Sequence, residues 1–155
     1  MHILVATAAD FVLDDIVAAL SGPDTSFTVC RNGRDVAGVV KGRTPDLAIL
    51  DLQIGSMGGM ATTMALRLDE SSGRAPHVPV LMLLDRQADV HLAKRSAADG
   101  WLVKPLDALT LQRKVAEILT PASTESADGT AEGENSWAEA SEATSAEEEE
   151  TVPAG

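Results

Sequence analysis

Cysteine, aromatic residues and long apolar stretches are all scarce in this sequence of 155 residues. The single cysteine, Cys30, has no partner for an internal disulfide, so we expect a reducing, cytoplasmic location. Aromatic residues make up 3% of the chain, so a core built from it must be aliphatic. The longest apolar run, residues 78–84, is far shorter than the roughly 20 residues that span a bilayer. No basic segment precedes the first apolar run, so neither a signal peptide nor membrane insertion is expected.

Basic residues are missing from the last part of the chain. From Pro121 onward there are ten acidic residues and no Lys or Arg, which leaves 14 of the 24 acidic and all 12 basic residues in the first 120 positions. The last part is rich in Ala, Ser, Thr, Glu and Gly, and cannot bury enough apolar surface to offset the entropy of ordering it. We therefore predict one domain over residues 1–120 and a disordered acidic tail over residues 121–155. No basic face is available for phosphates, so nucleic acid is not an expected partner.

Short apolar runs alternate with segments of helical spacing along the first 120 residues. The predicted strands are 3–6, 27–30, 47–50, 80–84 and 101–103, and the predicted helices are 11–20, 35–41, 60–68, 89–97 and 107–119. Asp10, which stands before the first of these helices, is predicted as its N-cap. Strands that alternate with helices predict an α/β fold with a doubly wound parallel sheet of five strands, covered on both faces.

In such a sheet, functional sites form beyond the carboxyl ends of the strands. The residues at or directly after the ends of the first, third, fourth and fifth predicted strands are residues 7–10, Asp51, Leu84 with Asp85, and Lys104 with Pro105. These positions are the candidates for chemistry.

Two of these strand ends resemble the CheY-like receiver domains of two-component response regulators. Residues 45–52, Pro-Asp-Leu-Ala-Ile-Leu-Asp-Leu, are similar to the family's third strand, in which the aspartate at the position of Asp51 accepts a phosphoryl group from a histidine kinase. Residues 98–106, Ala-Asp-Gly-Trp-Leu-Val-Lys-Pro-Leu, are similar to its fifth strand with a Lys-Pro pair, here Lys104-Pro105, whose peptide bond is cis in the family. The resemblance covers the chain to about residue 119. It implies a flavodoxin-like sheet of strand order 2-1-3-4-5 and a protein that is not an enzyme.

The same resemblance exposes a degenerate acidic pocket. In the family, Mg²⁺ is held by the phosphoacceptor aspartate and by an acidic pair after the first strand, and here Thr7 and Ala8 occupy the positions of that pair. Neither can replace a carboxylate ligand, so no metal is expected, or only weak Mg²⁺ binding through Asp51, with Asp10 as a conceivable substitute ligand. Leu84 replaces the switch Thr or Ser after the fourth strand. Without Mg²⁺, we predict a direct ion pair between Asp51 and Lys104.

Several functions are compatible with these residues. One is a stand-alone pseudo-receiver that acts in intracellular signalling through protein contacts, without a phosphorylation switch. Another is a conventional phosphorelay receiver, modified on Asp51 by a histidine kinase, and a third is a scaffold subunit of a larger assembly. The expected partners are a histidine kinase, another signalling protein or a second copy of the chain. Trp101, at the family's aromatic switch position, is a candidate contact residue, and no helix-turn-helix pattern follows residue 119.

Overall fold

The computed structural model describes residues 1–120, and the predicted acidic tail lies outside this described part. The strands are β1 (His2–Ala6), β2 (Ser26–Cys30), β3 (Leu47–Asp51), β4 (Val80–Leu84) and β5 (Gly100–Val103). The helices are α1 (Asp10–Leu20), α2 (Gly33–Gly42), α3 (Gly59–Ser71), α4 (Val90–Arg95) and α5 (Ala108–Leu119), and a 3₁₀ turn, η1 (Gln87–Asp89), precedes α4. The strands form one parallel sheet in the order β2-β1-β3-β4-β5, which confirms the predicted fold.

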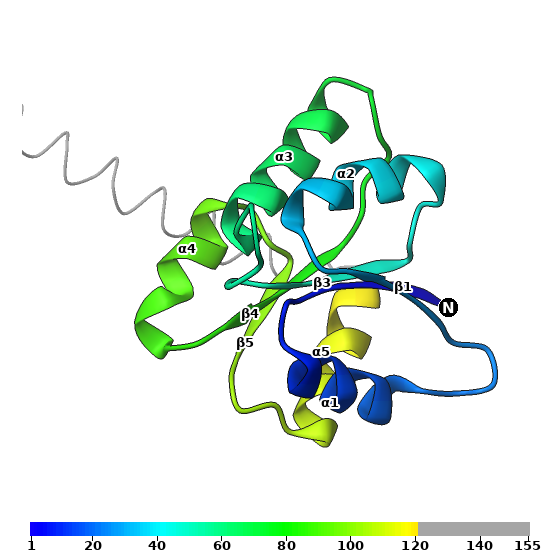
Figure 1. Ribbon diagram of the computed structural model, residues 1–155, viewed down its shortest axis with the longest axis vertical. Helices are drawn as coiled ribbons and strands as arrows, with labels where there is room; N and C mark the ends of the chain where they lie inside the picture. The colour runs from blue at the N-terminus through cyan, green and yellow to red at the C-terminus, as the bar shows by residue number, and fades with distance from the viewer. Residues whose placement is uncertain (121–155) are drawn as a thin grey trace, which may run out of the picture. The chain divides into compact units, whose positions relative to one another are not determined.

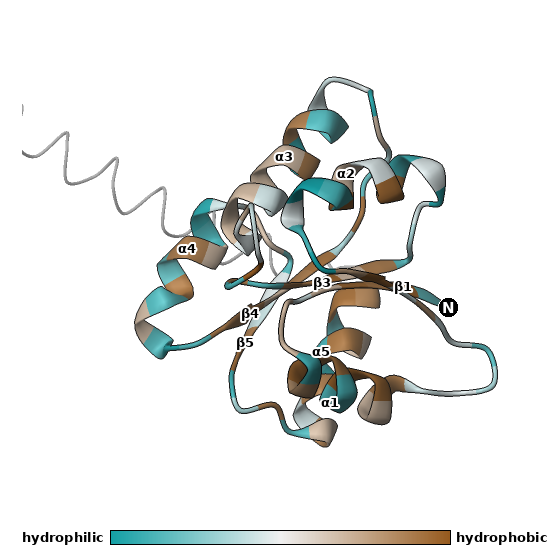
Figure 2. Ribbon diagram, in the orientation of Figure 1, coloured by the Kyte–Doolittle hydropathy of each residue, from teal (hydrophilic) through white to brown (hydrophobic). Residues whose placement is uncertain are grey.

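The sheet is a middle layer between two groups of helices, with α1 and α5 on one face and α2, α3 and α4 on the other (Figure 1). Every residue of β1, β3 and β4 is buried, because helices cover both faces of these strands. Alternate side chains serve opposite cores. Ile3 packs with the α1 and α5 side chains, and the next residue, Leu4, packs with those of α2 and α3. The inner strands are accordingly strongly hydrophobic, whereas the helices are amphipathic (Figure 2).

The strand register brings the carboxyl ends of the central strands to one edge of the sheet. Ala6 of β1 is paired with Leu50 of β3, and Asp51 is paired with Leu83 of β4. Leu84, the last residue of β4, is in turn paired with Val103 of β5. The residues that follow these positions therefore emerge side by side.

Several element boundaries differ from the sequence-based expectation, and two of them concern the helices α1 and α4. The prediction that Asp10 caps α1 is wrong: Ala9 holds the cap position, no side chain caps this helix, and Asp10 is its first residue. The Asp10 carboxylate instead pairs with the Arg31 guanidinium at 2.7 Å. The predicted helix 89–97 is also too long at its end, since α4 stops at Arg95 and Ala97 has a positive φ of 61°. Among residues 1–120, no helix has the length and apolar character that crossing a membrane requires.

Candidate functional site

The Asp51 carboxylate is the centre of the candidate site. It ends β3 and its residue is only 1% exposed. Its Oδ1 accepts hydrogen bonds from Lys104 Nζ at 2.7 Å and from the Gln53 backbone N–H at 3.1 Å. Its Oδ2 accepts a hydrogen bond from the Thr7 hydroxyl at 2.8 Å. A buried carboxylate is stable only when its charge is compensated, and here one cation and two neutral donors supply that compensation.

Thr7 stands directly after β1, and its side chain is fully buried. Its hydroxyl oxygen accepts a hydrogen bond from the Ala9 backbone N–H at 3.1 Å while its proton goes to Asp51. Thr7 is therefore a hydrogen-bond donor to the carboxylate at a position where the family has an acid. Ala8, the second residue of the degenerate pair, lies exposed at the rim and carries only a methyl group.

Lys104 follows β5 and carries the positive charge of the site. Its backbone N–H donates to the carbonyl oxygen of Leu84 at 2.8 Å, which extends the sheet pairing by one residue. Its Nζ contacts Asp51 and also Asp85 Oδ1, the latter at 3.0 Å. Burial tends to lower the pKa of Lys104, but the hydrogen bonds and charges of the two carboxylates outweigh it, so the pKa is raised and the ammonium form persists. The Lys104–Pro105 peptide bond is cis, as the resemblance implied, and Pro105 is exposed.

Leu84 and Trp101 lie outside the polar cluster, on the face of the sheet that α4 covers. Leu84 is fully buried and packs in a small apolar cluster with Met82 and Ala93. Its side chain therefore contributes to the core and offers no hydroxyl to a phosphate. Trp101 packs at the border of the same cluster and is half-buried, with the Lys94 ammonium 5.6 Å from its ring centroid. This spacing allows a cation–π contact.

The sequence-based reasoning noted Asp85 by position but gave it no role. Its carboxylate directly follows β4, and its side chain is 39% exposed. The available signal was its place at the shared sheet edge, one residue beyond Leu84. The structure thus brings Thr7, Asp51, Asp85 and Lys104 together, leaves Ala8 and Pro105 at the rim, and separates Leu84 and Trp101 from the cluster.

The residues present do not fit Mg²⁺, the ion that the family's chemistry uses. Mg²⁺ binds anionic oxygens, and Asp51 already accepts three hydrogen bonds. The Thr7 hydroxyl directs its proton at that carboxylate, and the exposed Asp10 is engaged by Arg31. Within residues 1–120, no three His, Cys, Asp or Glu side chains are grouped so that they could hold a metal ion.

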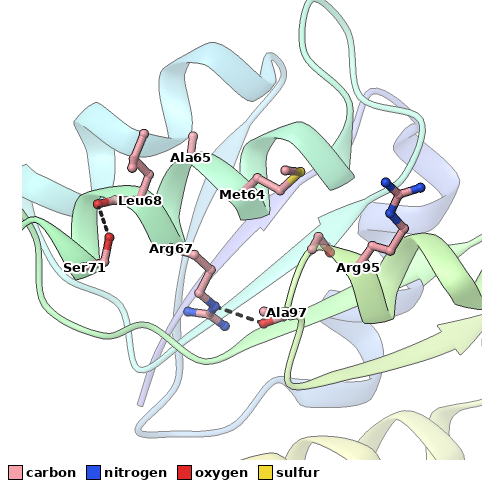
Figure 3. Close-up of a pocket in the computed structure, with 8 residues that line it drawn as sticks. Met64, Ala65, Arg67, Leu68, Ser71, Arg95 and Ala97 are labelled. Atoms are coloured by element: carbon pink, nitrogen blue, oxygen red, sulfur yellow. Dashed lines mark hydrogen bonds between the residues drawn. The ribbon is translucent and has the colours of Figure 1, made fainter.

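A separate hollow lies between α3 and the segment that joins α4 to β5 (Figure 3). Its volume is about 510 Å³, and its lining is formed by Met64, Ala65, Arg67, Leu68, Ser71, Arg95, Ser96 and Ala97. The Arg67 side chain is part of this lining, and its Nε–H donates to the Ala97 carbonyl oxygen at 3.0 Å. None of the predicted site residues lines this hollow.

Comparison with known proteins identifies the family. The model of the response regulator receiver domain matches residues 3–116, so the chain belongs to this family. The transcriptional regulatory protein CseB of Streptomyces avermitilis is 28% identical over 120 residues, which cover 76% of this chain and 48% of CseB. Protein PilH of Pseudomonas aeruginosa is 27% identical over 88 residues, which cover 57% of this chain and 72% of PilH. The chain thus spans about half the length of CseB.

Solved structures show the same fold. The chemotaxis response regulator CheY4 of Vibrio cholerae matches with a TM-score of 0.66 at 21% identity, over 76% of this chain and 97% of that one. The receiver domain of the sensor histidine kinase PA1611 from Pseudomonas aeruginosa, which has a magnesium ion coordinated in its active-site cleft, matches with a TM-score of 0.66 at 21% identity, over 76% and 96% of the two chains.

Proposed function

We propose that this chain is a pseudo-receiver, a member of the receiver family that acts in intracellular signalling through protein–protein contacts and without a phosphorylation switch. The observation that carries the proposal is the ion pair of 2.7 Å between Lys104 Nζ and Asp51 Oδ1, with Thr7 donating to the other carboxylate oxygen. Both oxygens of the phosphoacceptor position are engaged by side chains of the chain itself.

Charge supports this proposal. Phosphoryl transfer depends on positioning and on neutralisation of the charge on the transferred group. Around Asp51 the neutralising groups are the Lys104 ammonium, the Gln53 backbone N–H and the Thr7 hydroxyl, and the negative charge of Asp85 offsets part of the lysine's positive charge. The receiver pocket without Mg²⁺ therefore offers an incoming phosphoryl group too little positive charge for rapid transfer.

The region behind the pocket supports the proposal as well. Leu84 has no hydroxyl to bind a phosphate, and its side chain is packed against Ala93 of α4. A phosphoryl group on Asp51 would therefore lack the hydrogen-bonding group through which the family links phosphate to α4. We accordingly propose that partners recognise a constant surface. The half-buried Trp101, with Lys94 beside it, is our candidate contact residue.

An experiment that restores the acidic pair tests the proposal. The natural chain and the double variant Thr7→Asp, Ala8→Asp are each incubated with acetyl phosphate and Mg²⁺ and then analysed by intact mass spectrometry. The variant is expected to gain one phosphoryl group and the natural chain none, because only the variant has the carboxylates that hold the metal. A third chain, with Asp51→Asn added to the double substitution, shows whether the gain is on Asp51. Ready phosphorylation of the natural chain on Asp51 would overturn the proposal.

That outcome would favour the second candidate function, a conventional phosphorelay receiver with a histidine kinase as partner. The observation that favours this alternative is the retention of Asp51, Lys104 and the cis peptide bond to Pro105 in one cluster. CseB is named a transcriptional regulatory protein, but this chain matches about half of CseB, so a role in transcription is not part of our proposal. A cytoplasmic location and the absence of enzyme activity remain predictions, as does a homodimer.

A further inference from the structure

Two large apolar side chains of α3 are exposed side by side at the hollow shown in Figure 3. Met64 is 50% exposed and Leu68 is 61% exposed, and both line the hollow. Side chains four residues apart lie on the same face of a helix, so these two form a continuous apolar ridge. Single exposed apolar side chains are common on protein surfaces, whereas adjoining ones mark surfaces for interaction. The ridge is therefore a candidate contact surface, separate from the pocket around Asp51.

The opposite wall of the hollow is held in place by Arg67. Its guanidinium donates to the carbonyl oxygens of Ala97 at 3.0 Å and Val78 at 2.9 Å. It also pairs with Asp99 at 2.6 Å and with Glu70 at 3.3 Å. These contacts join α3 to the segment between α4 and β5, so both walls are formed before any partner arrives, which lowers the entropic cost of binding. Arg67 already has four acceptors, and its charge is compensated within the chain.

The remaining polar side chains of the lining differ in what they can offer a partner. The hydroxyls of Ser71 and Ser96 donate to the carbonyl oxygens of Leu68 and Ala93. Arg95 lines the hollow from the α4 side and is exposed (Figure 3). Among residues 1–120, no acidic side chain pairs with Arg95, and none lines the hollow. The hollow thus presents apolar surface and one uncompensated positive charge.

We propose that this hollow is a docking site for an acidic amphipathic helix of a partner protein. Its apolar stripe would pack on Met64 and Leu68, and one of its carboxylates would pair with Arg95. A helix fits better than an added strand, because the hollow presents side chains, whereas strand addition needs the free backbone of a sheet edge. The edge strands β2 and β5 contribute no residue to the lining. The inference goes beyond the proposed function, because this surface does not depend on the state of Asp51.

A display library of helical peptides tests the occupant. The peptides have about 20 residues, long enough to form a helix. They carry apolar residues at positions i, i+3, i+4 and i+7 and random residues elsewhere. Selection on the full chain should enrich peptides with more Asp and Glu than Lys and Arg, and the enriched peptides should not bind the double variant Leu68→Ser, Arg95→Gln. Both substituted side chains are exposed, so the core is left intact.

The matched control is the double variant Leu109→Ser, Arg113→Gln. Leu109 is 64% exposed and Arg113 is exposed, and both lie on α5, so the control removes the same two kinds of side chain from another surface. It should bind the enriched peptides as the natural chain does.

NMR titration locates the bound peptide and measures the single contributions. An enriched peptide should shift the backbone amide resonances of Ala65 and Ala97, one on each wall of the hollow. Leu68→Ser should weaken its binding about tenfold, because the partner no longer buries a leucine side chain. Arg95→Gln should weaken it about threefold, as expected for an exposed ion pair, and added salt should reduce this difference.

The inference is overturned if no peptide is enriched, if the enriched peptides have no acidic excess, or if they bind the Leu68→Ser, Arg95→Gln chain equally well. Amide shifts confined to the surface around Trp101 would also overturn it. Dimerisation of the natural chain in analytical ultracentrifugation that is lost in the double variant would assign the hollow to a second copy instead. None of these results depends on acetyl phosphate, so failure of this inference and failure of the proposed function are distinguishable.

Discussion

The hydrogen bond from Thr7 to Asp51 offers a quantitative test of how the pocket is held. Thr7→Val keeps the shape of the side chain and removes its hydroxyl, so Asp51 Oδ2 loses a donor at 2.8 Å and the Ala9 N–H loses an acceptor at 3.1 Å. A hydrogen bond to a charged group contributes about 1.5–3 kcal/mol, and the second, neutral bond about 1 kcal/mol or less. We therefore expect the free energy of unfolding to fall by about 2–4 kcal/mol.

The assay is urea unfolding followed by far-ultraviolet circular dichroism, with thermal unfolding as a check. A domain of 120 residues loses about 4 °C of Tm for each kcal/mol, so the expected decrease is about 8–16 °C. Thr63→Val is the matched control, because Thr63 is also fully buried but donates to a neutral acceptor within its own helix, the Gly59 carbonyl oxygen at 2.8 Å. The control should cost about 1 kcal/mol or less. Equal losses for the two variants would refute the view that Thr7 stabilises a buried charge.

Three other predictions concern pH, metal and tail. Burial and the charge of Arg43 lower the pKa of His2, so the unfolded chain, with a histidine pKa of about 6.5, binds the proton first. The free energy of unfolding should be at its full value above about pH 6.5 and should decline as the pH falls through the lower pKa of His2 in the folded chain. Urea unfolding at several pH values should show this decline. A decline of the same size in His2→Gln would contradict its attribution to His2. In a Trp137→Phe chain, Trp101 fluorescence should show no saturation at low millimolar Mg²⁺, and a saturable response lost in Asp51→Asn would exclude a metal-free pocket. Truncation after Thr120 should leave the urea midpoint nearly unchanged, whereas a large decrease would show that the tail contributes to folding.

The central strands were predictable because a strand that is buried on both faces appears in the sequence as a continuous apolar run. The predicted strand 80–84 matches β4. The predicted strand 47–50 is one residue shorter than β3, because it leaves out the charged but buried Asp51. A carboxylate is an unusual residue to bury, and hydrophobic patterning assigns it to a loop. Tertiary contacts with Lys104 and Thr7 make this burial tolerable.

Helix boundaries were less predictable because contacts between distant segments decide them. α2 begins at Gly33, two residues before its predicted start, where a Cβ atom would overlap the Met57 carbonyl oxygen. That close approach favours glycine, but a single sequence does not reveal the neighbouring loop. At the start of α4, residues 87–89 form a 3₁₀ turn before the α-helix, and Asp89 in this turn is buried and pairs with Arg86 at 3.0 Å.

The site was predictable at the level of strand ends and not at the level of side-chain direction. Parallel strands bring Asp51 and Lys104 to one edge, and the predicted ion pair between them is present. The second contact of Lys104, with Asp85, depends on the path of a flexible lysine side chain, which no sequence pattern specifies. The sequence showed that Thr7 stands where the family has an acidic residue. That its hydroxyl donates a hydrogen bond to Asp51 became visible only from the positions of both side chains in the structure.

The central claim is that this pocket does not accept a phosphoryl group, and an equilibrium measurement tests it most directly. Acyl phosphates hydrolyse, so a short-lived modification can escape mass spectrometry, whereas beryllofluoride mimics the phosphoryl group on an aspartate without reacting further. The natural chain is mixed with beryllium, excess fluoride and Mg²⁺, and bound fluorine is observed by ¹⁹F NMR. We predict only the resonances of free fluoride species, identical to those with Asp51→Asn. Bound fluorine resonances that appear with the natural chain and vanish with Asp51→Asn would contradict the pseudo-receiver account.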